Sequence, residues 1–252
     1  MKNSAMSIYW TESAPGYSEI ILDELENEQK KVWLDLIDGN RPEGQELKIL
    51  DAGCGPGFFS ILMAQQGHVV TAIDFSEGML ERAKQNAVAY GVGDKITFIK
   101  MDAQAPSFDD NSFDMILSRN ITWIFTKPVE AYSEWLRILK SGGKILNFDG
   151  NWHLHLFDEQ IMRKYQENLE KVQKMGYHYS TEHSVPDEEQ ELIMKNLPLS
   201  GLLRPDWDIK MLEKLGCRQI TVIKELPRNV MSEIYAIKNE HSPMFMVCAE
   251  KK

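Results

Sequence analysis

The chain has 252 residues, and 28 Lys and Arg against 38 Asp and Glu give it a formal net charge of −10 at pH 7. An excess of acidic groups repels phosphate backbones, and no basic strip with interleaved aromatic residues offsets it, so we expect no nucleic-acid partner. Three widely spaced cysteines argue against a disulfide framework, and residues 1–10 lack the apolar region of a secretory signal. Because no long uncharged apolar run predicts a membrane span either, we expect a cytoplasmic protein.

The chain opens with a helical segment. Apolar residues recur at helical spacing over residues 20–38, and a stretch with Gly and Pro at 39–44 ends this helix. The aromatic residues Tyr9, Trp10 and Tyr17 are expected to precede the helix. Residues 1–46 are therefore predicted to form an N-terminal helical flap.

Strands and helices alternate from residue 48 onward. The predicted strands lie at 48–51, 69–73, 96–101, 113–118 and 144–148, and the predicted helices at 58–66, 76–91 and 128–141. Ser76 is a suitable N-cap, Pro128 suits the first turn of a helix, and Gly142 with Gly143 is expected to stop that helix. Residues 47–150 are therefore predicted to form a doubly wound α/β core with a mostly parallel sheet.

The alternation breaks after residue 150. A long helix closed by Gly176 and an irregular stretch predict a helical lid insertion over residues 151–207. Asp208 is then expected to cap a short helix, followed by strands at 219–224 and 244–249. Because no crossover helix fits between these two strands, we expect them to pair antiparallel. Residues 208–252 would thus complete the core sheet.

A glycine-rich loop follows the first strand of the core. Asp51-Ala52-Gly53-Cys54-Gly55-Pro56-Gly57 opens a helix, and its glycines let a ligand approach the backbone closely. Asp51 would repel a pyrophosphate, but it suits the ammonium group of a methionine moiety. This acid and the G-x-G-x-G spacing disfavour an NAD-dependent oxidoreductase, which we retain as an alternative.

Two further acids close the next two strands. Asp74 ends the second strand, where a carboxylate can accept hydrogen bonds from both hydroxyls of a ribose. Asp102 ends the third strand, where an adenine amino group would lie. Three acids at the carboxyl ends of three successive strands predict one binding site for a nucleoside joined to an amino acid.

The chain resembles class I S-adenosylmethionine-dependent methyltransferases over about residues 47–150. The resemblance is carried by the glycine-rich loop, by the acids Asp74 and Asp102, and by the segments Ser112-Phe113-Asp114 and Leu139-Lys140-Ser141-Gly142-Gly143. It looks most like the subgroup with ubiquinone-, menaquinone- and other small-molecule enzymes. The resemblance implies a seven-stranded sheet with an antiparallel last strand, S-adenosylmethionine as cofactor and methyl transfer to a small-molecule acceptor. Ser118-Arg119-Asn120-Ile121 stands where amide and adenine-N6 methyltransferases carry Asn-Pro-Pro-Tyr. The implied cofactor-binding residues are Tyr17, Asp51, Gly53, Cys54, Gly55, Gly57, Asp74, Phe75, Ser76, Met79, Asp102, Ala103 and Arg119.

Residues at the flap and after the fourth and fifth strands are expected to contact the acceptor. An aromatic flap residue can face a sulfonium through a cation–π contact. The candidates are Tyr9, Trp10, Asn120, Trp123, Asp149 and Trp152.

A general base is needed only if the acceptor must lose a proton, and His153 and then His155 are the candidates for it. His178 and His183 could complete a metal site with this pair, but two nearby histidines without a clear third ligand are usually ordinary polar side chains, so we expect no metal. A non-catalytic S-adenosylmethionine-binding regulator remains a second alternative to an enzyme, and a homodimer stays open.

Overall fold

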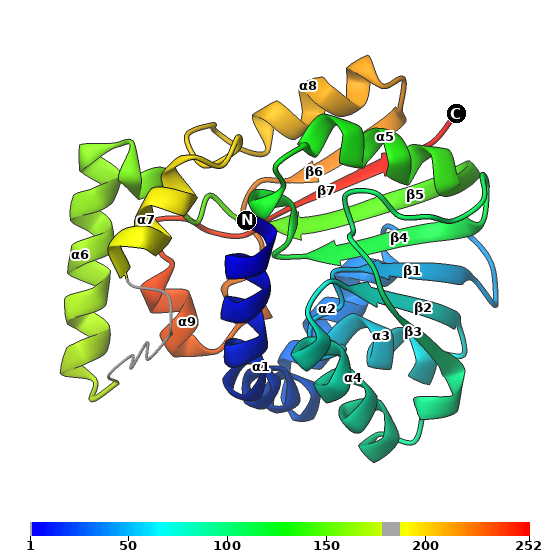
Figure 1. The fold of residues 1–252 in the computed structure, drawn as a ribbon, viewed down its shortest axis with the longest axis horizontal. Coiled ribbons are helices and arrows are strands. Elements are labelled where there is room, and N and C mark those ends of the chain that lie inside the picture. Colours follow the sequence, from blue (N-terminus) through cyan, green and yellow to red (C-terminus); the bar gives the residue numbers. More distant parts are fainter. Residues whose placement is uncertain (1, 178–186) are drawn as a thin grey trace.

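The fold is built around one seven-stranded sheet (Figure 1), and the computed structural model of the protein describes residues 2–177 and 187–252. The strand order is β3-β2-β1-β4-β5-β7-β6. The strands are β1 (Lys48–Ala52), β2 (Val69–Asp74), β3 (Ile96–Lys100), β4 (Phe113–Arg119), β5 (Leu139–Asp149), β6 (Arg218–Ile223) and β7 (Phe245–Glu250). The first five strands run parallel, whereas β7 runs antiparallel to both β5 and β6. The predicted fold class is confirmed, including the antiparallel last strand.

Helices cover both faces of the sheet. One face packs against α2 (Gln29–Asp38), α3 (Phe58–Gln65) and α4 (Glu77–Ala89), and the other against α5 (Pro128–Ile138) and α8 (Asp206–Lys214). Trp33 and Trp135 are fully buried, one in each of the two apolar layers. The central strands β1 and β4 are buried over most of their length, as expected of parallel strands covered on both sides.

Four further helices gather beyond the carboxyl ends of the strands (Figure 1). They are α1 (Lys2–Glu26), α6 (Glu159–Lys174), α7 (Asp187–Lys195) and α9 (Glu233–Lys238), with the short 3₁₀ turns η2 (Thr122–Ile124), η3 (Leu154–Leu156) and η4 (Arg228–Val230) nearby. The strand order reverses between β1 and β4, so the cleft of an open α/β sheet falls under these helices.

Three local predictions are wrong. Tyr9, Trp10 and Tyr17 lie inside α1 rather than before the first helix. Gly142 and Gly143 lie inside β5, because the preceding helix already ends at Ile138. Asp208 lies inside α8 rather than at its N-cap, because its carboxylate is fully buried in an ion pair with Arg204. The predicted cap at Ser76 is correct, since its Oγ accepts a hydrogen bond from the Met79 N–H at 3.3 Å.

Candidate functional site

The glycine-rich loop between β1 and α3 forms the floor of the site. Gly53 and Cys54 both donate backbone hydrogen bonds to the Ile73 carbonyl, which ties the loop to the end of β2. Gly53 has a φ of +74°, and a Cβ there would lie 1.9 Å from the Ile121 Cδ1 atom. Glycine at this left-handed position therefore lets the loop pack closely against the Ile121 side chain.

Asp51 and Asp74 flank this loop as buried carboxylates. Asp51 accepts a hydrogen bond from the Ser60 hydroxyl at 2.5 Å, and Asp74 accepts from the Gly55 and Ser76 N–H groups at 3.0 and 2.8 Å. Burial raises the pKa of Asp51 to about 7 and that of Asp74 to about 6. Both groups therefore favour a ligand that brings positive charge or hydrogen-bond donors.

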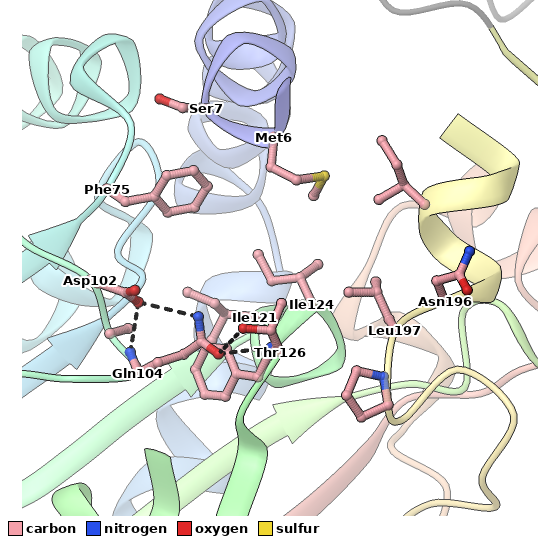
Figure 2. Close-up of a pocket in the computed structure, with 14 residues that line it drawn as sticks. Met6, Ser7, Phe75, Asp102, Gln104, Ile121, Ile124, Thr126, Asn196 and Leu197 are labelled. Carbon is pink, nitrogen blue, oxygen red and sulfur yellow. Dashed lines mark hydrogen bonds between the residues drawn. The ribbon is translucent and has the colours of Figure 1, made fainter. Parts of the chain in front are cut away.

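Asp102 lies on the wall of a cavity of about 460 Å³ beyond the ends of β2 and β3. Figure 2 shows this cavity between Phe75, Asp102 and Ile121 on the core side and Met6 of α1 and Leu197 after α7 on the outer side. Asp102 accepts a hydrogen bond from the Gln104 N–H at 2.9 Å, which fixes its carboxylate at the rim. A few polar side chains among largely apolar walls, with the Asp102 carboxylate as the one charged group, suit a flat heterocycle with an amino group.

The cleft near the glycine loop is narrow. Two cavities of about 50 and 30 Å³ lie there, with Tyr17, Gly53, Gly55 and Arg119 on the walls of both. Tyr17 comes from α1, so this helix lies directly over the loop. A ligand along the loop must displace α1 side chains to enter.

Arg119 lies where these cavities meet the next one. Its guanidinium donates two hydrogen bonds to the Glu24 carboxylate of α1, at 2.6 and 2.8 Å. The same group stacks over the rings of Trp33 and Phe58, at 4.7 and 4.9 Å from their centroids. The ion pair thus neutralises the arginine and fastens α1 to the end of β4.

Beyond Arg119 lies a cavity of about 200 Å³, which we call the aromatic cavity. Four of the six residues expected to contact an acceptor line it: Trp10, Asn120, Trp123 and Trp152. Tyr9 and Asp149 do not line it. Sequence reasoning missed Tyr235 and Lys238 of α9 on its wall, because no motif marks that short helix.

Asn120 joins the two halves of the site. Its φ of +55° is a left-handed conformation that non-glycine residues rarely adopt. Its Oδ1 atom is buried without a hydrogen-bond partner among the described residues. Asn120 lines both the narrow cavity at the loop and the aromatic cavity, so it stands between a ligand on the loop and one among the indoles.

Asp149 lies behind the wall of the aromatic cavity rather than on it. The carboxylate is fully buried and forms a 2.9 Å ion pair with Arg204, which also binds Asp208. It accepts hydrogen bonds from the Trp152 indole at 2.9 Å and from the Trp123 backbone N–H at 3.0 Å. Asp149 is thus not placed for the direct acceptor contact that was expected. Its carboxylate instead fixes Trp123 and Trp152, which line the cavity.

The two candidate bases are not placed for that role. The His153 ring packs against Trp123 at 4.8 Å between centroids, and neither histidine lines the cavities described above. Burial lowers the pKa of His153 to about 4, which makes it a weak base near neutral pH. His155 is buried and stacks on Tyr165 at 4.1 Å, and burial lowers its pKa as well.

Metal ligands do not converge in the part of the chain that the structure describes, where no three His, Cys, Asp or Glu side chains form a candidate metal site. His178 and His183 lie outside the described residues. Burial raises the pKa of Cys54 well above its usual range, so its thiol stays protonated beside the loop. Across residues 2–177 and 187–252, none of the helices is both long and apolar enough to cross a membrane.

Comparison with known proteins identifies the domain. Residues 50–147 match the family model described as a methyltransferase domain. A malonyl-[acyl-carrier protein] O-methyltransferase of Erwinia pyrifoliae is 39% identical over 44% of this chain and 40% of its own length. A demethylmenaquinone methyltransferase of Clavibacter sepedonicus and a tRNA 5-carboxymethoxyuridine methyltransferase of Escherichia coli are each 38% identical over 39% of this chain, and over 39% and 38% of their own lengths.

The chain matches about two fifths of the length of these curated relatives. A protein of Methanococcus maripaludis proposed to be an S-adenosylmethionine-dependent methyltransferase has the same fold, with a TM-score of 0.59, 21% identity and coverage of 96% of this chain and 93% of that one. Residues 50–147 are therefore similar to methyltransferase domains, and the family resemblance seen over this part of the sequence is confirmed.

Proposed function

We propose that this protein transfers the methyl group of S-adenosylmethionine to a small-molecule acceptor held in the aromatic cavity. The observation that carries the proposal is one continuous arrangement of side chains. Asp51, Asp74 and Asp102 stand at the ends of three neighbouring strands, and Asn120 joins them to a cavity walled by indoles.

The residues present fit this cofactor. Asp51 would bind the ammonium group of the methionyl part, Asp74 the ribose hydroxyls and Asp102 the adenine amino group. At Gly55 the space in the Cβ direction is open, with a Tyr17 ring carbon as the nearest atom at 3.9 Å, so the loop presents bare backbone there. When bound, the cofactor supplies an electrophilic methyl group on a sulfonium, so the protein has little covalent chemistry to perform.

The chain's own task is to align the acceptor and to exclude water. Trp10 and Tyr17 of α1 close the cleft from one side, and Trp123 and Trp152 wall the aromatic cavity from the other. Alignment of this kind lowers a barrier by about 7–11 kcal/mol. No step in this scheme requires a histidine base, which agrees with the positions of His153 and His155.

The two alternatives make different demands on the site. The pyrophosphate of NAD would have to lie against the buried carboxylate of Asp51. Repulsion between these two anionic groups disfavours NAD. A non-catalytic regulator would need no acceptor space, whereas the aromatic cavity adjoins the cofactor end at Asn120. We also infer a cytoplasmic protein, because Cys54, Cys217 and Cys248 are all free thiols.

Two measurements test the proposal. Calorimetry should show binding of S-adenosylhomocysteine and none of NAD. Incubation with methyl-labelled S-adenosylmethionine and a cell extract should give a labelled small molecule that mass spectrometry identifies. Binding of S-adenosylhomocysteine without any labelled product would favour the regulator, and tight binding of NAD would overturn the cofactor assignment.

A further inference from the structure

A second cavity lies against the aromatic cavity on the side away from the glycine loop. It has a volume of about 470 Å³ and lies between η4, α9 and the start of β7. Met231, Asn239 and Met244 line both cavities, so these three side chains form the partition between them. No motif in the sequence points to this space.

Two of the three partition residues are methionines. Methionine is unbranched and rotates about three side-chain bonds, so it re-packs at little cost. Met231 is half-buried and Met244 is buried, at the mouth of the last strand. A change of rotamer at Met231 and Met244 is the movement that a passage between the two cavities would require.

The volumes show why the two cavities belong together. Pockets for small molecules usually enclose about 300–1,000 Å³. The aromatic cavity, at about 200 Å³, falls below that range, whereas the second cavity reaches it alone. The aromatic cavity is large enough for the group of the acceptor that receives the methyl. It is too small for the remainder of a typical small-molecule acceptor.

The lining of the second cavity indicates what it would hold. Its floor is apolar, with Leu226 and Val230 buried. The ionisable rim carries no net charge, since Lys164 and Arg228 stand against Glu225 and Glu240, and Arg228 already pairs with Glu240 at 3.3 Å. The adjoining His241 adds no charge at neutral pH, because burial lowers its pKa to about 4.

We propose that the acceptor has two parts: a reacting head in the aromatic cavity and an uncharged, largely apolar extension that passes between Met231 and Met244 into the second cavity. This inference rests on the proposed methyl transfer. It adds the chemical class of the acceptor, which neither cavity alone would define.

The test begins with the labelled product from a cell extract incubated with methyl-labelled S-adenosylmethionine. Mass spectrometry should show an acceptor with an uncharged aliphatic or aryl extension attached to the methylated group. A product no larger than the aromatic cavity would overturn the inference while leaving the proposed methyl transfer intact. Absence of any labelled product, with S-adenosylhomocysteine bound, would overturn both.

Two variants then test where the extension lies. Ala236 is buried on α9 and lines the second cavity but not the aromatic cavity, so Ala236→Phe should obstruct part of the second cavity, and Met231→Trp should close the partition. Each should raise the KM for the purified acceptor by about tenfold or more, with kcat at saturation within about twofold. Ala89→Phe, at an exposed position of α4 away from the described cavities, is the matched control and should keep the wild-type KM.

S-adenosylhomocysteine affinity and the unfolding midpoint show whether each variant is folded. Should Ala236→Phe prove unstable, Met231→Trp carries the test, because Met231 is only half-buried. Folded variants with wild-type KM for the acceptor would overturn the inference and leave the methyl transfer standing.

Discussion

Ion pairing divides the buried carboxylates of the protein into two kinds. Asp149 and Asp208 are fully buried, but both pair with Arg204, so their charge is already compensated. Asp51 and Asp74 are almost as buried, yet their hydrogen bonds come from neutral hydroxyl and amide donors. Burial raises the pKa of both Asp51 and Asp74, and these neutral donors offset that effect only in part. The first pair holds the structure together, and the second is ready for a ligand.

Asp74→Ala should weaken S-adenosylhomocysteine binding by about 1.5–3 kcal/mol, the usual contribution of hydrogen bonds to a charged group. The ribose hydroxyls would lose their acceptor, and the Gly55 N–H would lose the carboxylate that fixes the loop. Calorimetry measures the change, with the exposed Asp94→Ala as control. Equal affinities in the two variants would contradict the assignment.

The affinity for S-adenosylhomocysteine should depend on pH through Asp51. Its carboxyl has a pKa of about 7 in the free protein, and only the ionised form attracts the ligand's ammonium group. Proton and ligand therefore compete, so affinity is highest above pH 7 and falls by about tenfold per pH unit once the carboxyl is protonated. Titration calorimetry from pH 8 to pH 6 should show this loss, and Asp51→Asn should bind weakly with a flatter profile. An Asp51→Asn profile as steep as the wild type would contradict the role of this carboxyl.

Asp149 is a positioning residue whose loss should affect the acceptor more than the cofactor. Asp149→Asn removes a charged hydrogen-bond acceptor from the Trp152 indole and the Trp123 backbone, so the wall of the aromatic cavity should loosen. We expect the acceptor KM to rise by about tenfold, with S-adenosylhomocysteine affinity within about 1 kcal/mol of the wild type.

Asp208→Asn is the matched control for this change. It breaks the other half of the same buried network and contacts neither Trp123 nor Trp152. Both variants should lose stability, by about 3–5 kcal/mol at most. An equal rise of KM in both would mean that Asp149 acts through stability alone.

Among the helices, those at the site were the hardest to predict from the sequence. The strands and the helices of the core follow from apolar periodicity, and Ser76 and Pro128 mark two helix starts correctly. The helix α9 has only six residues, too few for a stable isolated helix, so its formation depends on packing against α6 and η4. Tyr235 and Lys238 reach the cavity through that packing, which sequence periodicity does not encode.

The position of α1 over the site depends on Gly78 in α4. A Cβ on Gly78 would lie 2.9 Å from the Thr11 Cγ2 atom and 3.1–3.2 Å from its backbone, so Gly78→Ala must push α1 outward. We expect the free energy of unfolding to fall by about 1–3 kcal/mol, as for overpacking in a core. Amide exchange should speed up in α1 while the sheet stays protected, and S-adenosylhomocysteine should dissociate faster.

Gly16→Ala provides the comparison within α1 itself. Nothing lies within 4 Å of the Cβ that it would add, so it should stabilise the helix by up to about 1 kcal/mol. If both alanine variants exchanged at the same rate in α1, contact with Gly78 would not hold the helix in place.

Across the whole molecule, charge and topology were predictable, whereas the acceptor side was only partly so. The order of strands and acids in the sequence predicts Asp51, Asp74 and Asp102 at one edge of the sheet, where the structure has them. Asp149 was expected on the cavity wall because it ends β5, just as the other three acids lie at the ends of their strands. Its partner Arg204 comes from 55 residues further along the chain, and this long-range ion pair turned the carboxylate inward.

Nucleic acid is not expected to bind, although one curated relative carries the name of a tRNA methyltransferase. The net charge of −10 opposes a polyanion, and the cations at the cleft are already engaged. Arg119 pairs with Glu24 and Arg204 with two aspartates, and Asp102 is the only ionisable residue among those described around the 460 Å³ cavity. The cleft therefore offers few cationic side chains to neutralise phosphates and release their counterions.

We therefore expect no retardation of total tRNA or of a short DNA duplex in gel-shift assays at 50 mM or at 150 mM salt. Methyl label from S-adenosylmethionine should not appear in tRNA under conditions where the cell extract yields a labelled small molecule. Binding that weakens steeply between the two salt concentrations would reveal a phosphate-binding surface that the charge distribution does not suggest. Transfer of label to tRNA would show that the acceptor class, though not the cofactor, has been assigned wrongly.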